Sequence, residues 1–347
     1  MNTDTPARRS FPPAGPALRT VSIVGTGAYL PERILTNQEL EQLVETSDEW
    51  ITSRTGIRAR RIGRPDQAAS DLAAPAARRA LEAAGVAPEQ VDLIIVASIT
   101  PDMIFPSTGC FVQHLIGARN AFCMDVQAAC SGFLYGLSVA HQYLATGAAD
   151  TALVIGAEKL SSVVDWQDRQ TCVLFGDGAG AAVLQPRGAP RGILSSVLGA
   201  DGSLSNLLML PGGGSRHPTS EQTLKDRLHY LKMTGREVFK HAVTHMTQAA
   251  LDALAKSGLT IDDVDWVVPH QANRRIVEAI GDRLGAPLDK YVLTIEKYGN
   301  MSAASVIVAL DEAARDGRLK NGDIVLLVAF GGGFTWGAMV LEWYQPT

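Results

Sequence analysis

Long apolar runs alternate along this chain with segments in which apolar residues recur at helical spacing. The clearest apolar runs cover residues 91–96, 150–156, 264–268 and 323–329. Continuous Val, Ile and Leu residues are typical of parallel strands that are covered on both faces. Helical patterns precede the first and third runs and end at Gly85 and Gly258, where glycine favours a helix end. The pattern predicts an α/β fold.

The chain also contains an internal repeat. Asp92 and Asp265 stand at the start of matching apolar runs, 173 residues apart. Asp150 and Asp323 begin the next matching pair of runs at the same separation. We therefore predict two duplicated halves, residues 19–186 and 192–347, joined by the segment 186–192.

Composition places the chain among globular proteins, except at its start. Hydrophobic residues make up 46% of the 347 positions and charged residues 19%, which is typical of a chain with a large core. Residues 1–18 are rich in Pro, Ala and small polar residues, and we predict a disordered tail there. The longest apolar runs fall short of the roughly 20 residues of a membrane span, and no signal-peptide core is present. We expect a cytoplasmic protein without membrane contact.

Charge and cysteine content exclude further classes. A net charge of −5 argues against general nucleic-acid binding, although a local basic patch can still attract an acidic partner. Cys110, Cys123, Cys130 and Cys172 lack the spacing of zinc sites or disulfide frameworks. We predict no metal site and a reducing compartment.

Cys130 is the strongest candidate for chemistry. It ends an apolar, strand-like run and begins a helix pattern of small residues. At the start of a helix, free N–H groups and the helix dipole favour a thiolate, which predicts a lowered pKa. The small neighbours Ala129 and Gly132 leave space beside the sulfur. A buried structural cysteine is the alternative, and it is the default for the other three cysteines.

Two further turns supply polar groups that complement a reactive thiol. His270 follows an apolar run, and Asn300 follows a glycine, although each alone is compatible with a structural histidine or a turn residue. Cys130 and Asn300 stand 38 and 35 residues beyond the repeated aspartates, so we predict both in the turn after a middle strand of their half. The glycine-rich turn 331–333 lets backbone amides approach a reacting oxygen. We predict one shared site.

These groups predict acyl-thioester chemistry in two stages. The Cys130 thiolate attacks a thioester, backbone N–H groups hold the oxyanion, and the acyl group stays on sulfur. A second, carboxylated thioester then loses CO2. The resulting enolate needs hydrogen-bond donors rather than a base, and neutral His270 and the Asn300 amide suit that role.

Longer motifs add a family resemblance. They are ETSDEWI at 45–51, RTGI at 54–57, FPS at 105–107, AACSGF at 128–133, FGDGAGA at 175–181, PHQAN at 269–273, YGN at 298–300 and GGGFTWG at 331–337. On these motifs the chain resembles the β-ketoacyl-acyl-carrier-protein synthase III enzymes of the thiolase superfamily over residues 20–345. The resemblance implies a thiolase-like five-layered αβαβα fold, a homodimer and no permanently bound cofactor. It also implies initiation of type II fatty-acid synthesis from a short acyl-CoA, such as acetyl-CoA, and malonyl-acyl carrier protein.

The resemblance assigns catalytic roles by motif position. It makes Cys130, His270 and Asn300 the catalytic triad, and it assigns the oxyanion hole to the backbone N–H groups of Cys130 and Gly332. Phe105 matches a residue that reaches the acyl pocket of the partner subunit. Without the resemblance, the motif GDGAG at 176–180 superficially suggests a phosphate loop, but no lysine follows at the required spacing, so it predicts close backbone packing.

The resemblance also assigns the coenzyme A contacts, to Thr46, Trp50, Arg54, Arg169 and Asn273. Trp50 and Arg169 fall on either side of the adenine, and Asn273 lines the pantetheine tunnel. Taken alone, Trp50 is more typical of core or amphipathic surface, and the two arginines of solvated charges.

A row of positive charges is a candidate docking surface. Lys232, Arg236 and Lys240 recur every four residues, which predicts one helical face, and a solvated face is the alternative. The resemblance gives Lys240 and Arg275 to the docking of the acidic acyl carrier protein. Two features depart from the family: the segment 210–231 is longer, and Arg274 replaces an apolar residue.

Other proteins of the superfamily share much of this pattern. A polyketide starter enzyme or a quinolone-type synthase can carry the same triad. A thiolase needs a second reactive cysteine near the C-terminus, and residues 329–337 contain none. A non-catalytic scaffold that binds coenzyme A or acyl carriers is the alternative from another class, and the intact triad disfavours it.

Overall fold

The computed structural model describes residues 18–187 and 192–344. Residues 1–17 of the predicted tail and residues 188–191 of the predicted join lie outside the described residues. No helix in the described part of the chain is long and apolar enough to cross a bilayer.

The first half of the chain builds a five-stranded sheet in the order β1-β7-β6-β4-β5. β4 pairs in parallel with β5 and β6, whereas β7 is antiparallel to both β6 and β1. Two of the predicted strands correspond to β4 and β6. The bounds are Val21–Tyr29 for β1, Leu93–Ala97 for β4, Phe122–Val126 for β5, Ala152–Lys159 for β6 and Asp177–Pro186 for β7.

The second half builds a four-stranded sheet of the same pattern, in the order β11-β12-β13-β8. β11 is parallel to β12, and the other pairs are antiparallel. The place of β5 is taken here by an isolated bridge between Val267 and Tyr291. The bounds are Ile193–Ala200 for β8, Trp266–Pro269 for β11, Ile324–Gly331 for β12 and Thr335–Glu342 for β13.

The repeat extends to individual hydrogen bonds. The backbone N–H of Thr151 donates to Asp92 Oδ2 at 3.0 Å. The backbone N–H of Ile324 donates to Asp265 Oδ2 at 2.8 Å, and donors and acceptors are each 173 residues apart. The repeated aspartates thus hold the starts of equivalent strands, which supports the proposed division into halves 19–186 and 192–347.

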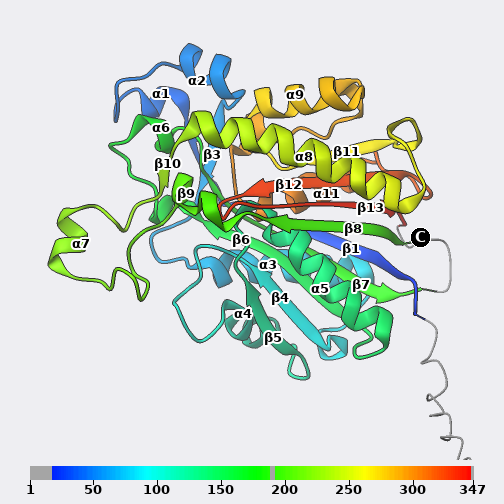
Figure 1. Cartoon of the computed structure of the whole chain (residues 1–347). Coiled ribbons are helices and arrows are strands. Elements are labelled where there is room, and N and C mark those ends of the chain that lie inside the picture. Colours follow the sequence, from blue (N-terminus) through cyan, green and yellow to red (C-terminus); the bar gives the residue numbers. More distant parts are fainter. Residues whose placement is uncertain (1–17, 188–191, 345–347) are drawn as a thin grey trace, which may run out of the picture.

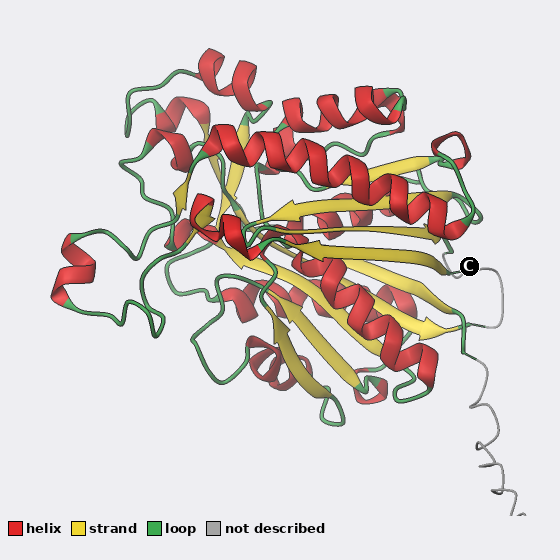
Figure 2. Ribbon diagram, viewed as in Figure 1, coloured by secondary structure: helices red, strands yellow, loops and turns green. Residues whose placement is uncertain are grey.

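Helices and sheets form five layers (Figures 1 and 2). α3 and α4 cover the outer face of the first sheet, α5 and α11 lie between the sheets, and α8 and α9 lie on the outer side of the second sheet. The predicted five-layered αβαβα fold is confirmed. The bounds are Ala69–Ala84 for α3, Thr108–Ile116 for α4, Gly132–Thr146 for α5, Gly235–Ser257 for α8, Arg274–Leu284 for α9 and Ala304–Arg315 for α11.

Smaller elements gather at one end of the layers, on the left in Figure 1. Many of them share an apolar cluster that includes Leu40, Ile51, Val173 and Ile295. The bounds are Arg33–Thr36 for β2, Asn37–Leu40 for α1, Asp48–Thr55 for α2, Ala59–Ile62 for β3, Arg169–Cys172 for α6, Leu208–Met209 for β9, Glu221–Lys225 for α7, Lys232–Met233 for β10 and Ile295–Tyr298 for α10.

The glycines of the 176–180 motif serve close packing, as the sequence predicted. A Cβ on Gly180 would lie 2.6 Å from Ile307 Cγ2 in α11, which is shorter than any tolerable contact. β7 therefore packs directly against the central helix layer, and most of the motif lies within that strand.

Candidate active site

Cys130 lies in a tight turn between β5 and α5. It belongs to the short 3-10 helix Ala129–Ser131, and its side chain is buried. Ala129 has φ 45°, a left-handed conformation that is unfavourable for residues other than glycine. The predicted helix start is confirmed, but β5 is the edge strand rather than a middle one. The prediction placed it wrongly because β4, the strand between β5 and β6, precedes both in the sequence.

Asn300 follows the short helix α10 instead of a strand, so its predicted position after a middle strand is also wrong. The second sheet has only the bridge at Tyr291 where β5 would lie. At the repeat separation, Ala129 corresponds to Ser302, which also has φ 45°. The same sharp turn therefore occurs in both halves, with Cys130 just after it and Asn300 just before it.

His270 follows β11, where the sequence placed it. Its backbone N–H donates to the carbonyl of Val328 at 2.8 Å, and only 1% of the residue is exposed. Burial lowers the pKa of His270 to about 3, so the imidazole is neutral at physiological pH. Nδ1 is buried without a hydrogen-bond partner in the described part of the chain, which leaves Nε2 as the nitrogen available to the cavity.

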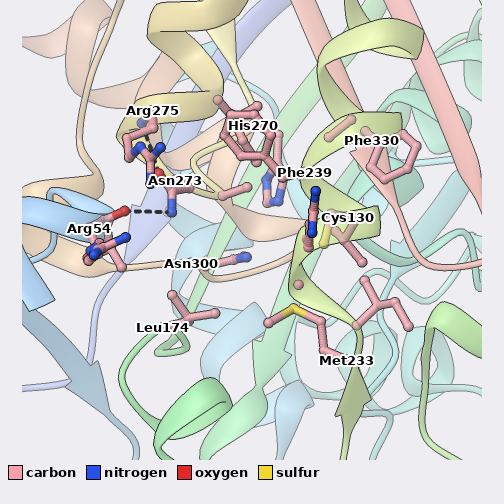
Figure 3. A pocket seen from close by; sticks show the side chains of 18 of the residues that line it. Arg54, Cys130, Leu174, Met233, Phe239, His270, Asn273, Arg275, Asn300 and Phe330 are labelled. Atoms are coloured by element: carbon pink, nitrogen blue, oxygen red, sulfur yellow. Dashed lines mark hydrogen bonds between the residues drawn. The ribbon is translucent and has the colours of Figure 1, made fainter. Parts of the chain in front are cut away.

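The three side chains line one cavity of about 510 Å³. Figure 3 shows Cys130, His270 and Asn300 around the same space, although they come from different halves of the chain. The walls are mainly apolar and include Leu208, Met233, Phe239, Met246 and Phe330. A small polar group set in an apolar pocket is the usual form of a small-molecule site.

The resting thiol is not acidic. Burial raises the pKa of Cys130 to about 12, and the nearby Glu158 carboxylate acts in the same direction. The predicted lowering of the pKa is therefore wrong for the free site, because removal of water outweighs the stabilisation that hydrogen bonds to the sulfur provide. The thiol must lose its proton during the attack.

The turn between β12 and β13 packs on the backbone of Cys130. A Cβ on Gly331 would lie 2.5 Å from Cys130 N, so only glycine allows this approach. Thr335 Oγ1 fastens the turn by donating to the carbonyl of Ala128 at 2.9 Å, and Ser131 Oγ donates to Thr335 Oγ1 at 2.7 Å. The arrangement brings the 331–333 turn beside Cys130 N–H, as an oxyanion site requires.

The cavity opens among positive charges. Arg54, Arg236 and Arg275 line it and are exposed, whereas the catalytic candidates are buried. Asn273 Nδ2 donates to the carbonyl of Arg54 at 3.1 Å, and Asn273 Oδ1 accepts from Arg275 N at 2.8 Å (Figure 3). Asn273 thus caps α9 and ties it to α2 at the mouth.

The other predicted coenzyme A residues are Trp50 on α2, which lines the cavity, Arg169 on α6 and Thr46 in the loop before α2. Arg169 Cζ lies over the Trp50 ring, 4.7 Å from its centre, and Arg169 Nη1 donates to the carbonyl of Glu45 at 2.9 Å. An adenine can enter between Trp50 and Arg169 only if they separate. Thr46 Oγ1 is buried without a hydrogen-bond partner among the described residues.

The predicted docking residues lie partly as expected. Lys240 on α8 and Arg275 on α9 are exposed on packed neighbouring helices. Lys232 is not on their helical face: it pairs in the strand β10 with Met209, and α8 begins only at Gly235. The prediction from the four-residue spacing is wrong for Lys232 because residues 232–233 are extended.

Phe105 and the segment 210–231 do not line the cavity. Phe105 is 81% exposed in the loop before α4. The segment 210–231 carries α7, which projects from the body of the molecule in Figure 1. Its flanking residues Leu208 and Met233 do reach the cavity wall, and no local sequence signal had marked them.

Comparison with known proteins defines the family. Residues 124–202 match the family model for 3-Oxoacyl-[acyl-carrier-protein (ACP)] synthase III, and residues 254–343 match the model for its C-terminal part. The chain is 56% identical over 324 residues to beta-ketoacyl-[acyl-carrier-protein] synthase III of Desulfitobacterium hafniense (strain DSM 10664 / DCB-2), an alignment covering 93% of this chain and 98% of the relative. The chain belongs to the beta-ketoacyl-[acyl-carrier-protein] synthase III family.

Solved structures of similar proteins have the same fold. The 3-oxoacyl-[acyl-carrier-protein] synthase III of Aquifex aeolicus VF5 is 46% identical, with a TM-score of 0.87 over 93% of this chain and 100% of that chain. The priming beta-ketosynthase of the R1128 polyketide pathway is 38% identical, with a TM-score of 0.90 over 96% of this chain and 99% of that chain. The two relatives named as synthase III enzymes are thus more similar in sequence to this chain than this polyketide enzyme is.

Proposed function

We propose that this chain condenses a short acyl-CoA, such as acetyl-CoA, with malonyl-acyl carrier protein and so initiates type II fatty-acid synthesis. The observation that carries the proposal is the meeting of Cys130, His270 and Asn300 in one cavity whose mouth is lined by arginines. Acyl-CoA and the carrier protein are substrates, and the steps use only groups of this chain. No permanently bound cofactor is required.

The first step is transfer of the acyl group. The Cys130 sulfur attacks the thioester carbonyl, the bond to the coenzyme A sulfur breaks, and the proton that left Cys130 ends on the released thiol. The backbone N–H groups of Cys130 and Gly332 hold the oxyanion. The close approach of Gly331 to Cys130 N supports this assignment.

The second step is decarboxylation and condensation. The malonyl group loses CO2, and the electron pair of the broken C–C bond forms an enolate. The enolate oxygen accepts hydrogen bonds from His270 and Asn300. Ser302 N donates to Asn300 Oδ1 at 2.8 Å, which leaves the Asn300 NH2 group free to donate. The enolate carbon attacks the acyl carbon, the C–S bond breaks and releases the 3-oxoacyl product, and the Cys130 thiolate takes up a proton from solvent.

Mass spectrometry of the intact chain tests the proposal directly. After mixing with acetyl-CoA, we expect one acetyl adduct, which peptide mapping places on Cys130. Cys110→Ala, which removes an exposed cysteine, is the matched control and should be acylated at the wild-type rate. Folded protein without an adduct on Cys130 would favour the non-catalytic binding scaffold.

We assign substrate contacts at the mouth as part of the same proposal. Thr46, Trp50, Arg54, Arg169 and Asn273 bind coenzyme A, and Phe105 belongs to the acyl pocket of a partner subunit. Displacement of Arg169 from Trp50 by adenine predicts that coenzyme A quenches Trp fluorescence in the wild type and less in Trp50→Phe. Equal quenching in the two proteins would contradict the assignment.

Reversing one charge tests carrier docking. Lys240→Glu is expected to weaken binding of the malonyl carrier protein about 10-fold and to reduce its salt dependence, because an attractive charge becomes repulsive. Lys256→Glu, at the far end of the same helix, is the control. Unchanged affinity and salt dependence for Lys240→Glu in a calorimetric titration would reject docking at this surface.

We further propose a homodimer that forms at the β5 side of the first sheet. β5 is an edge strand, Phe122 on it is 43% exposed, and Ile104 and Phe105 are more than 80% exposed. Open strand edges and exposed apolar side chains favour association. Light scattering at micromolar concentration that gives the mass of one chain would contradict this.

The free cysteines fit a reducing compartment, and we propose that the protein acts in the cytoplasm.

A further inference from the structure

A carboxylate without a role in the two steps is buried near the reacting sulfur. Glu158, near the end of β6, is fully buried. Its carboxylate accepts hydrogen bonds from Thr100 Oγ1 at 2.6 Å, from Ser98 Oγ at 3.3 Å and from Ile99 N at 3.2 Å. Burial raises its pKa to about 7. Burying a charged group is unfavourable, so a buried carboxylate beside a catalytic candidate suggests a specific role.

Ser302 is a neighbour of both this carboxylate and Cys130. Its hydroxyl is buried and makes no hydrogen bond with the described residues. The Glu158 carboxylate and the Cys130 thiol are nevertheless both near enough to interact with it. A serine hydroxyl can donate to one of these groups while accepting from the other.

The backbone holds Ser302 firmly in this place. A Cβ on Gly156 would lie 2.4 Å from the carbonyl oxygen of Ala303, so β6 packs directly on the turn. Ser302 also has the left-handed φ of 45° and donates its N–H to Asn300 Oδ1. Ser302 therefore binds Asn300 directly and is also a neighbour of Cys130.

We propose that Ser302 is a positioning residue that, together with the Glu158 carboxylate, fixes the Cys130 sulfur and controls how readily it becomes a thiolate. The inference rests on the proposed function, in which Cys130 is the nucleophile. Glu158 acts on the sulfur through Ser302 and through its own charge.

Ser302 and Glu158 have opposite effects on the stability of the Cys130 thiolate. The Ser302 hydroxyl stabilises a thiolate by a hydrogen bond, whereas the Glu158 charge disfavours a second negative charge nearby. The other titratable group at the sulfur in the described chain is His270 in the cavity, which burial keeps neutral. Removing the hydroxyl should therefore make the thiol less reactive, and removing the charge should make it more reactive.

Alkylation of the full-length protein by iodoacetamide tests this from pH 6 to 10, with the Cys130 peptide quantified by mass spectrometry. At pH 8 we expect Ser302→Ala to react roughly 10-fold more slowly and Glu158→Gln several-fold faster, as a change of about one pKa unit gives. Alanine suits position 302 because Ala129 adopts the same φ in the equivalent turn. Ser195→Ala, which removes a buried serine that donates to Ala253 O, should react like the wild type.

Opposite changes in the two variants support the proposal. Changes in the same direction, or wild-type rates in both variants with unaltered melting temperature, overturn it. If Glu158→Gln does not fold, an unchanged rate for Ser302→Ala alone overturns it. Alkylation needs no acyl-CoA, so a Cys130 that is alkylated but never acylated would refute the proposed function instead.

Discussion

Cys130→Ala is expected to reduce kcat/KM for condensation by roughly 10⁴-fold or more, because no other group can carry the acyl intermediate. The same variant should still release CO2 from malonyl-acyl carrier protein. Decarboxylation needs only the two donors to the enolate oxygen, and neither depends on the sulfur. We expect CO2 release to stay within a few-fold of the wild-type rate.

Asn300→Ala is expected to show the reverse pattern. Its acylation by acetyl-CoA should remain within a few-fold of the wild type, while CO2 release falls about 100- to 1000-fold through loss of one enolate donor. His270→Ala should behave similarly, because burial keeps the imidazole neutral and its one remaining N–H can donate to the enolate oxygen.

The measurement is release of labelled CO2 from malonyl-acyl carrier protein, paired with adduct formation at Cys130. Cys172→Ala is the matched control, since it removes another buried cysteine that does not line the cavity. The division of roles would be refuted if Asn300→Ala lost acylation as fully as decarboxylation, or if Cys130→Ala still condensed its substrates.

The architecture could be predicted from the sequence because the repeated residues make equivalent hydrogen bonds in the two halves. Asp92 and Asp265 mark equivalent strand starts, and each accepts a hydrogen bond from the equivalent backbone donor. The three catalytic candidates could be found because each stands at a junction between elements. The positions of the adjoining strands within each sheet could not be predicted, because strand order is set by pairing between segments that are distant in the sequence.

The pKa of Cys130 and the residues of the cavity wall could not be predicted from the sequence, mainly because both depend on burial in the folded chain. The pKa of Cys130 depends on how much water surrounds it and on Glu158, which comes from another strand of the sheet. The cavity wall combines Leu208, Phe239 and Phe330 from three elements, and none has a local pattern that distinguishes it from the core. Lys232 fits a helical spacing but is extended, because it pairs with β9.

Gly331→Ala is expected to slow acylation of Cys130 by about 100- to 1000-fold, the effect of losing one oxyanion donor. The added Cβ would lie 2.5 Å from Cys130 N and 3.0 Å from Ala129 Cβ, so one of the two turns must move. Oxyanion donors act only within about 2.7–3.1 Å of the developing charge. The expected effect is steric, since Gly331 does not have a positive φ.

Two comparisons separate this effect from general damage. Gly202→Ala adds a methyl group where nothing lies within 4 Å, and it should acylate normally. Alkylation of Cys130 by iodoacetamide needs no oxyanion site, so Gly331→Ala should slow acetylation far more than alkylation. Rapid-quench mass spectrometry gives the acetylation rate, and equal slowing of both reactions would mean that the methyl group displaces the sulfur itself. Acetylation at the wild-type rate would show that this turn does not hold the oxyanion, because a donor displaced by a clash of this size cannot keep its geometry.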